Sequence, residues 1–305
     1  MAEPLAIPAN LAATVVRWTG DHGAEWLAAL PGIVAGVAEA WDLEVDPPIE
    51  PGGNISWVAP VRRRSDDADA VLKVQLPDPE SEPEAIGLQA WDGDGAVRLL
   101  AHDPDRRALL LERCRPGRAL GDEGGGRAAV EAGAAVARRL HTAAVPPGLP
   151  RLADVLGPWS DELEVRLARQ VAIDPGLAAL ALATMRAPAG DSAPVLLHGD
   201  LNPTNVLAAE RSAWLAIDPK PMVGEAVFDG PRLVLQPAPT QSDDPVRMLA
   251  TRLDVIADGL EVDRGALARW CLVDAIRVGA WMWDHDDRPA ADFWLANVDL
   301  LRPHL

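Results

Sequence analysis

The 305-residue sequence has few cysteines and no block of basic residues. Its two cysteines, Cys114 and Cys271, do not suggest a disulfide framework, and no paired Cys or His motif suggests a zinc site. Lysine and arginine total 28 against 46 aspartates and glutamates, which gives a net charge of −18. Because nucleic acids and anionic membranes attract basic patches, we expect neither as a partner.

Long apolar runs and targeting signals are also absent from the sequence. No run reaches the roughly 20 residues that a transmembrane helix needs, and the first residues, Met1 to Pro8, lack the basic and apolar regions of a signal peptide. We therefore expect a cytoplasmic protein. Apolar residues make up 49% of a chain long enough for two lobes. The acidic surface is compatible with a cationic ligand, although we interpret it mainly as a source of solubility.

Four polar residues, His198, Asp200, Asn205 and Asp218, lie close together in the sequence between apolar runs. The flanking pattern predicts a strand, a loop, a strand, a turn and a further strand. Asp200 and Asn205 are separated by four residues, which is the spacing of the kinase catalytic loop. Phosphoryl transfer needs such groups, because its catalysis depends on positioning and on neutralising phosphate charge.

Each of these residues has a role that its chemistry predicts. We expect Asp200 to accept or orient the proton of an attacking hydroxyl group. Asn205 and Asp218 offer the hard oxygen ligands that Mg²⁺ prefers, and His198 is interpreted as a structural residue that bonds the loop backbone. The alternative is that Asp200 and Asn205 only cap turns. The neighbouring Asn202-Pro203 and the Asp-Pro pair at Asp218 favour the catalytic interpretation.

The first part of the chain has the pattern of a sheet with helices. Residues 24–43 have apolar residues near helical spacing, although Pro31 and Gly32 interrupt the pattern. Apolar runs predict four strands, at residues 55–59, 70–76, 97–101 and 108–113.

Lys73 lies between apolar residues inside the second predicted strand, where a charged side chain requires an explanation. In kinases, such a lysine pairs with the α- and β-phosphates and is held by a helix glutamate. We expect Glu84 to be that glutamate, with Glu82 as the rival candidate. The alternative is an edge-strand lysine that points to water and guards against aggregation.

Two further segments are candidates for nucleotide contacts. Gly52, Gly53 and Asn54 precede the first strand, where glycine lets backbone N–H groups approach phosphate. A simple turn is the alternative, because the full glycine-rich kinase pattern is missing. Backbone groups near Glu112 and Cys114 are candidates for binding an adenine edge at a hinge between lobes, and a core strand followed by a turn is the alternative there.

The later part of the chain is predicted to be mainly helical, with helices at residues 127–141, a broken pair at 160–187, and two more at 246–260 and 264–283. After the last of these come Asp284, Asp286 and Asp287. These carboxylates are candidates for binding the guanidinium or ammonium groups of an acceptor. The alternative is a solvated helix end.

The segment His198-Gly-Asp-Leu-Asn-Pro-Thr-Asn205 resembles the catalytic loop of the aminoglycoside phosphotransferases, relatives of the protein kinases. Together with Trp214-Leu-Ala-Ile-Asp-Pro219, it resembles one branch closely, the streptomycin 6-kinases and hydroxyurea phosphotransferases. The similarity extends from about Trp26 to Trp283. Glu225 and Gly230 depart from the family pattern, which usually has Asp and Leu at these places.

The resemblance implies an α+β, two-lobed protein-kinase-like fold. Residues 1–113 would form a nucleotide-binding lobe with a small antiparallel sheet, and residues 114–305 a larger, mainly helical lobe for catalysis and acceptor binding. The implied reaction is ATP-dependent and Mg²⁺-dependent phosphorylation of a small cationic acceptor, with the 6-hydroxyl of streptomycin as the first candidate and antibiotic resistance as the consequence. Hydroxyurea, an amino sugar or another metabolite is the alternative acceptor. A nucleotide-binding protein without catalytic activity is the alternative of another class.

Overall fold

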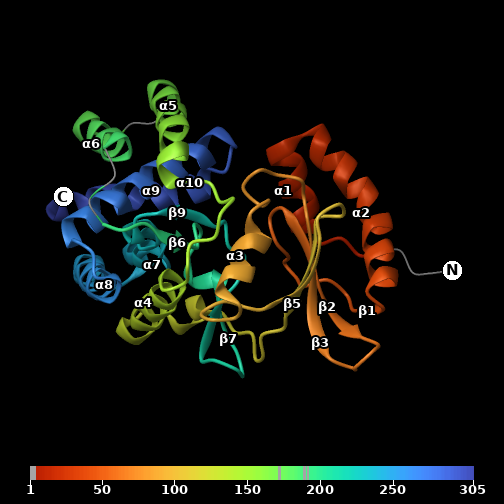
Figure 1. Ribbon diagram of the computed structural model, residues 1–305. Helices are drawn as coiled ribbons and strands as arrows, with labels where there is room; N and C mark the ends of the chain where they lie inside the picture. The colour runs from red at the N-terminus through yellow and green to blue at the C-terminus, as the bar shows by residue number, and fades with distance from the viewer. Residues whose placement is uncertain (1–4, 171–172, 188–189, 191) are drawn as a thin grey trace. The chain divides into compact units, whose positions relative to one another are not determined.

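The computed structural model describes residues 5–170, 173–187, 190 and 192–305, and the chain forms two compact units (Figure 1). The first unit contains Met1–Gly93 and Val97–Cys114, and the second contains Asp94–Ala96 and Arg115–Leu305. The first unit has an antiparallel sheet and the second is mainly helical, so the predicted α+β class is confirmed.

The sheet of the first unit has five antiparallel strands in the order β1-β2-β3-β5-β4. The strands are β1 (Leu43–Val45), β2 (Ser56–Arg63), β3 (Asp69–Gln75), β4 (Leu99–Asp103) and β5 (Ala108–Glu112). All four predicted strands are present with shifted ends. Strand β1 was not predicted, and its three residues are too few for a periodic signal to show in the sequence.

Three α-helices accompany this sheet, namely α1 (Ala9–Thr19), α2 (Asp21–Ala40) and α3 (Glu84–Trp91). Helix α2 replaces the helix predicted over residues 24–43, and it continues through Pro31. Its buried side chains, which include Trp26, Leu30, Val34 and Val37, belong to the same apolar core as the sheet. This packing keeps the helix continuous where local propensity would interrupt it.

The two faces of the central strand β3 have different environments. Ala70, Leu72 and Val74 contribute to the core shared with α1 and α2. Because side chains alternate along a strand, Lys73 and Gln75 point to the other face, where both contact Glu84 of α3. The sheet therefore separates an apolar core from a small buried polar cluster.

The second unit is built from seven α-helices among the described residues. They are α4 (Arg127–His141), α5 (Leu152–Gln170), α6 (Pro175–Arg186), α7 (Pro231–Leu235), α8 (Pro245–Leu260), α9 (Arg264–Asp284) and α10 (Arg288–Leu301). Short 3₁₀ segments are η1 (Leu120–Glu123), η2 (Pro203–Asn205), η3 (Ala226–Asp229), η4 (Pro239–Gln241) and η5 (Arg302–His304).

Helix α9 forms the centre of this helical group, and α5, α6, α7, α8 and α10 all contact it (Figure 1). The predicted helices are present, and the predicted break in the pair at 160–187 coincides with Asp174, which caps α6 by accepting the N–H groups of Gly176 and Leu177. Residues 171–172 of that pair lie outside the described residues. Along the part of the chain that the structure describes, no helix is long and apolar enough to cross a membrane.

Four short strands carry the central loop of the second unit. Strand β6 (Val195–Leu197) pairs with β9 (Met222–Gly224), and β7 (Val206–Ala208) pairs with β8 (Trp214–Ala216). The predicted strands are confirmed. Among these four strands, β7 and β8 form a hairpin. Strand β6 is separated from β7 by a loop and pairs with β9 instead.

Candidate active site

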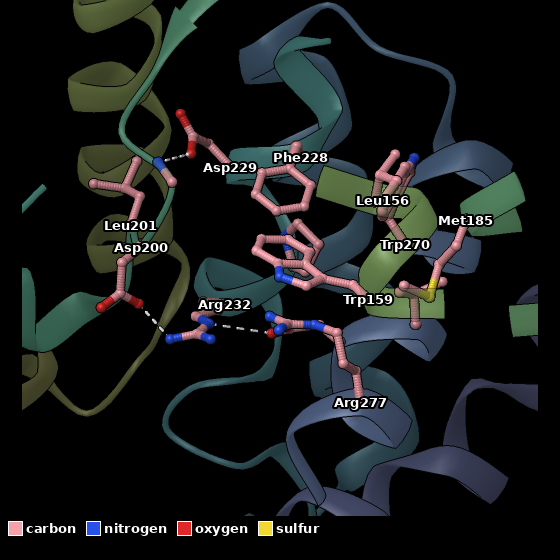
Figure 2. A pocket seen from close by; sticks show the side chains of 14 residues that line it. Leu156, Trp159, Met185, Asp200, Leu201, Phe228, Asp229, Arg232, Trp270 and Arg277 are labelled. Atoms are coloured by element: carbon pink, nitrogen blue, oxygen red, sulfur yellow. Dashed lines mark hydrogen bonds and ion pairs between the residues drawn. The ribbon is translucent and has the colours of Figure 1, made fainter. Parts of the chain in front are cut away.

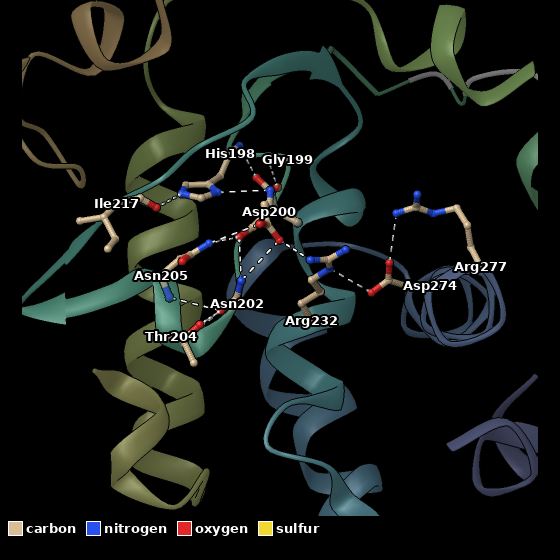
Figure 3. Close-up of polar contacts among 11 residues, drawn as sticks. His198, Gly199, Asp200, Asn202, Thr204, Asn205, Ile217, Arg232, Asp274 and Arg277 are labelled. Atoms are coloured by element: carbon tan, nitrogen blue, oxygen red, sulfur yellow. Dashed lines mark hydrogen bonds and ion pairs between the residues drawn. The ribbon is translucent and has the colours of Figure 1, made fainter. Parts of the chain in front are cut away.

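The loop between β6 and β7, residues 198–205, is held close to the segment that follows β8 (Figure 3). Gly199 has φ +79°, and a Cβ atom there would lie 2.1 Å from the carbonyl oxygen of Lys220. A side chain at this position is therefore excluded both by backbone conformation and by space. The N–H of Lys220 donates to the carbonyl of His198 at 2.8 Å, which ties the two segments together.

His198 is fully buried and bonds the loop backbone at both ring nitrogens. Its Nε2 is 3.0 Å from the carbonyl oxygen of Ile217, which can only accept, so Nε2 donates. Its Nδ1 is 3.3 Å from the N–H of Asp200, which can only donate, so Nδ1 accepts. Because Nδ1 accepts, the ring is in its neutral form and bonds the loop backbone, as predicted. Burial lowers the pKa of His198 against the opposing effect of nearby carboxylates.

Asp229, at the end of η3, fixes the start of the same loop. Its carboxylate accepts the N–H groups of His198 and Gly199, each at 2.9 Å, and a hydrogen bond from His141 Nε2, also at 2.9 Å. Burial alone would raise the pKa of Asp229, but the hydrogen bond and charge of His141, with the donors of the loop, hold it below its ordinary value. No function was assigned to Asp229 from the sequence.

Asn202 performs the turn capping that was the alternative explanation for Asp200 and Asn205. Its Oδ1 accepts from the N–H groups of Thr204 and Asn205 at 2.9 and 3.2 Å and so begins η2. Asn205 Nδ2 donates to the carbonyl of Asp200 at 3.0 Å and lies 3.4 Å from Asp200 Oδ2. The amide group of Asn205 therefore uses its nitrogen toward Asp200, and its oxygen is the atom that can act as a metal ligand.

Asp218 lies at the same end of the β7–β8 hairpin as Asn205. The N–H of Ile217 donates to the carbonyl of Asn205 at 2.9 Å, and Asp218 follows with φ +55°. A carboxylate and an amide oxygen fit Mg²⁺, which commonly takes one or two carboxylates and completes its shell with phosphate and water. Within the described residues, no group of three or more His, Cys, Asp or Glu side chains offers a metal site of another kind.

Lys73 in the first unit forms a buried ion pair with Glu84. Lys73 Nζ lies 2.5 Å from Glu84 Oε2, and the side chains are 5% and 2% exposed. The rival Glu82 pairs with Arg107 at 3.3 Å near the surface. Since β3 lies between β2 and β5, Lys73 is not on a sheet edge. Desolvation makes a buried ion pair a costly way to gain stability, so stability alone does not account for the pair.

The other predicted nucleotide contacts belong to two segments of the first unit. Gly52, Gly53 and Asn54 lie before β2 and are separated from it by Ile55, and Gly52 adopts φ +84° beside Pro8. Glu112 ends β5, and both its N–H and its side chain contact the backbone of Arg98. Because this N–H is used within the sheet, it is not a donor for adenine. Cys114 is the last residue of this unit and is half-buried.

A pocket in the second unit opens beside Asp200 (Figure 2). One side is aromatic: Phe228 stacks with Trp159 at 6.3 Å between ring centroids and meets Trp270 edge-on at 5.5 Å. The other side is charged. The cavity between the two sides has a volume of about 20 Å³, which is room for roughly one water molecule.

The charged side of the pocket is a chain of alternating charges (Figure 3). Arg232 Nη1 donates to Asp200 Oδ1, and Arg232 Nε donates to Asp274 Oδ2 at 3.3 Å. Arg277 approaches the other oxygen of Asp274 at 3.5 Å and lies over Trp159 at 4.6 Å. Sequence reasoning missed these three residues. A possible signal was Asp274, a carboxylate inside the apolar run of a predicted helix.

The three predicted acceptor carboxylates are not among the residues that line this pocket. Asp284 accepts from Arg166 of α5 at 2.8 Å, and Asp287 caps α10 by accepting from the N–H of Ala290 at 3.3 Å. Asp286 is 89% exposed and lies 3.6 Å from Arg288. The structure therefore gives each of these neighbours a contact within the chain.

Comparison with known proteins identifies relatives over most of the chain. The model of a family described as aminoglycoside/hydroxyurea antibiotic resistance kinase matches residues 41–286. The streptomycin 6-kinase of Streptomyces griseus is 37% identical over 300 residues, which cover 94% of this chain and 93% of that protein. The hydroxyurea phosphotransferase of Kitasatospora aureofaciens is 38% identical over 288 residues, or 90% of this chain and 79% of that protein.

The fold also resembles solved structures with much lower sequence identity. The crystal structure of a thermostable mutant of aminoglycoside phosphotransferase APH(4)-Ia, in a ternary complex with ADP and hygromycin B, has a TM-score of 0.64. The sequences are 14% identical, and the match covers 88% of this chain and 97% of that chain. At this identity the likeness establishes the fold, which is the kinase-like fold that the catalytic-loop motif predicted.

Proposed function

Since the chain belongs to the aminoglycoside/hydroxyurea antibiotic resistance kinase family, we propose that it transfers the γ-phosphoryl group of ATP to a small-molecule hydroxyl group, with the 6-hydroxyl of streptomycin as the first candidate. The observation that carries this proposal is the position of Asp200 on the pocket wall, in a loop held by Asp229 and His198. A carboxylate so held can receive a proton from a hydroxyl group in the pocket.

The chemistry divides among the residues as follows. Asp200 accepts or orients the proton of the acceptor hydroxyl while that oxygen attacks the γ-phosphorus, and the bond between this phosphorus and the β–γ bridging oxygen breaks to release ADP. Lys73, held by Glu84, binds the α- and β-phosphates. Asn205 and Asp218 would hold Mg²⁺, which would neutralise charge on the phosphates. These four residues together favour an active kinase over a nucleotide-binding protein without catalytic activity.

Streptomycin as acceptor is supported by the 37% identity to the Streptomyces griseus kinase. Asp274 in the pocket is a carboxylate that can receive a guanidinium group, in addition to the predicted group Asp284, Asp286 and Asp287. Nucleotide contacts through Gly52–Asn54 and through backbone groups of the segment from Glu112 to Cys114, other than the N–H of Glu112, belong to the same proposal.

A second candidate acceptor is uncharged, such as hydroxyurea. It is favoured by the charge balance of the pocket, where Asp200 and Asp274 each already pair with an arginine. A cationic acceptor must compete with Arg232 and Arg277 for these carboxylates, whereas a neutral one need not. The 38% identity to a hydroxyurea phosphotransferase supports the same candidate.

The test is a measurement of ADP formation from ATP and Mg²⁺ with streptomycin, hydroxyurea and an amino-sugar panel, followed by mass and ³¹P NMR spectra of the product. We expect phosphorylated streptomycin carrying phosphate at the 6-hydroxyl, and product formation slowed by about 10²–10⁴-fold in Asp200→Asn at matched enzyme concentration. Phosphorylation of hydroxyurea alone would keep the chemistry and replace the acceptor. Absence of acceptor-dependent ADP formation with every compound would contradict the proposal.

A further inference from the structure

Arg232 is the residue at this site whose role neither the motif nor the proposed function explains. It lies on α7, its side chain is 25% exposed, and its guanidinium group is 5.7 Å from the ring of Trp294. One nitrogen donates to Asp200 and another to Asp274 of α9. The guanidinium group thus bridges the proposed proton acceptor and the wall of the pocket.

The bond from Arg232 acts on the orientation of the Asp200 carboxylate. Rotation about the last torsion of an aspartate is soft, so neighbours decide where its oxygens point. Asn205 Nδ2 lies 3.4 Å from Oδ2, which is a weak constraint, whereas Arg232 makes a charge-assisted bond to Oδ1. Each carboxylate oxygen has two acceptor sites. Oδ1 accepts from Arg232 and, at 3.4 Å, from Asn202 Nδ2, so Oδ2 is the oxygen that can receive a proton from a hydroxyl group.

Asp274 in turn holds Arg232. It is 12% exposed, and it contacts Arg232 Nε while Asp200 contacts Nη1. These two nitrogens belong to one planar group, so the two carboxylates are kept at a fixed relation to each other. A lysine has a single charged nitrogen and cannot reproduce this geometry.

We propose that Arg232 is a positioning residue for phosphoryl transfer. It orients the carboxylate of Asp200 toward the acceptor hydroxyl, and Asp274 in turn orients the guanidinium group of Arg232. This inference rests on the proposed function, since it requires Asp200 to act on an acceptor. In this proposal Arg232 has no contact with phosphate, and it affects turnover only through Asp200.

The test is a double-mutant cycle in turnover. We expect Arg232→Gln to lower kcat about 10–100-fold, which corresponds to the loss of one charge-assisted hydrogen bond. The KM for ATP should stay within about twofold of the wild-type value, since no contact with the nucleotide is removed. In the Asp200→Asn background, the same change should have almost no further effect, because residues that act through each other are not additive.

Two companion variants separate positioning from folding. Arg232→Lys should recover part of the lost kcat, because the positive charge returns without the planar fork. The matched control is Arg264→Gln, which removes another arginine that pairs with a carboxylate, Asp254 at 2.5 Å, on the surface of the same unit. This control should keep the wild-type kcat. Thermal melts of every variant check that the fold is retained.

The outcomes decide between the claims. Suppose that the wild type is active and that Arg232→Gln lowers kcat by the same factor in the wild-type and Asp200→Asn backgrounds. That result would overturn the positioning role and leave the kinase assignment standing. A wild type inactive toward all acceptors overturns both. If Arg232→Gln does not fold, Asp274→Asn replaces it in the same cycle, and an unchanged kcat there would count against the proposal.

Discussion

Each unit contains a cation–carboxylate pair, and the two pairs differ in exposure. The enclosed pair keeps its partners, whereas the other is an exchangeable pair, in which water or a ligand can replace a partner. Lys73 and Glu84 are enclosed, with exposures of 5% and 2%. Arg232 and Asp200 face a pocket, with exposures of 25% and 16%. Breaking the first pair leaves a charge that water cannot reach, whereas water or an acceptor can replace a partner in the second. The first pair therefore serves as a fixed support, and the second can respond to a ligand.

The largest expected effect is the loss of the proton acceptor in the exchangeable pair. Asp200→Asn should lower kcat by about 10²–10⁴-fold, the range for removal of a general base. The KM for ATP should hardly change. Steady-state kinetics with a phosphorylated acceptor as the product measure both values. Turnover near the wild-type level would remove Asp200 from the mechanism.

The second prediction compares the stabilities of the two pairs directly. Lys73→Ala should destabilise the protein by about 3–5 kcal/mol, because Glu84 then remains as a buried charge without this lysine. Arg232→Ala should cost less, because this pair is more exposed than Lys73 and Glu84 and because Arg277 still pairs with Asp274. Urea unfolding with a probe in each unit measures the two values. Equal losses would show that exposure does not distinguish the pairs.

A control variant tests whether the buried charge of Glu84 causes the loss of stability expected for Lys73→Ala. Lys73→Met with Glu84→Gln removes both charges and keeps similar volumes, so it should recover much of the stability lost in Lys73→Ala. Turnover should stay low, because the group proposed to bind phosphate is missing. Recovered turnover would show that Lys73 has no part in catalysis.

The third prediction concerns the neutral histidine beneath the loop that carries Asp200. Burial lowers the pKa of His198 from its ordinary value of 6.5, so the unfolded chain binds a proton there more readily than the folded protein. Its contribution to stability is present above pH 6.5 and is lost as pH falls below that value. Melting temperatures from pH 7.5 to 5.5 should decline, with a smaller slope for His198→Gln. An equal slope would assign the acid sensitivity to other groups.

The smallest expected effects concern the acceptor carboxylates outside the pocket. We expect at least one Asp→Asn change among Asp284, Asp286 and Asp287 to raise the KM for streptomycin without changing that for ATP. Added salt should weaken acceptor binding more in wild type than in that variant, since a screened attraction has been removed. Asp274→Asn gives the comparison within the pocket. If all three surface variants keep the wild-type KM, acceptor recognition does not involve this group.

Local sequence was enough to predict the loop that carries Asp200, because the parts of this loop are neighbours in the chain. Asp200, Asn205 and Asp218 lie within 19 residues, and short strands of predictable pattern carry them. Lys73 had a further signal, since it is one of only two lysines in the sequence and interrupts an apolar strand. Glu84 followed from the acidic start of the next helix. Such short-range patterns report which backbone conformation each segment prefers.

Tertiary packing alone decided the partners on the far side of Asp200. Arg232 is 32 residues from Asp200 and 42 from Asp274, and no periodic pattern links a five-residue helix to the middle of α9. The same holds for the pairing of β6 with β9 and for the separate contacts of Asp284 and Asp287. Contacts of this kind depend on which faces of the helices pack together, and many sequence patterns are compatible with each arrangement. The sequence thus determined the chemistry of the loop, whereas the fold decided which charges surround it.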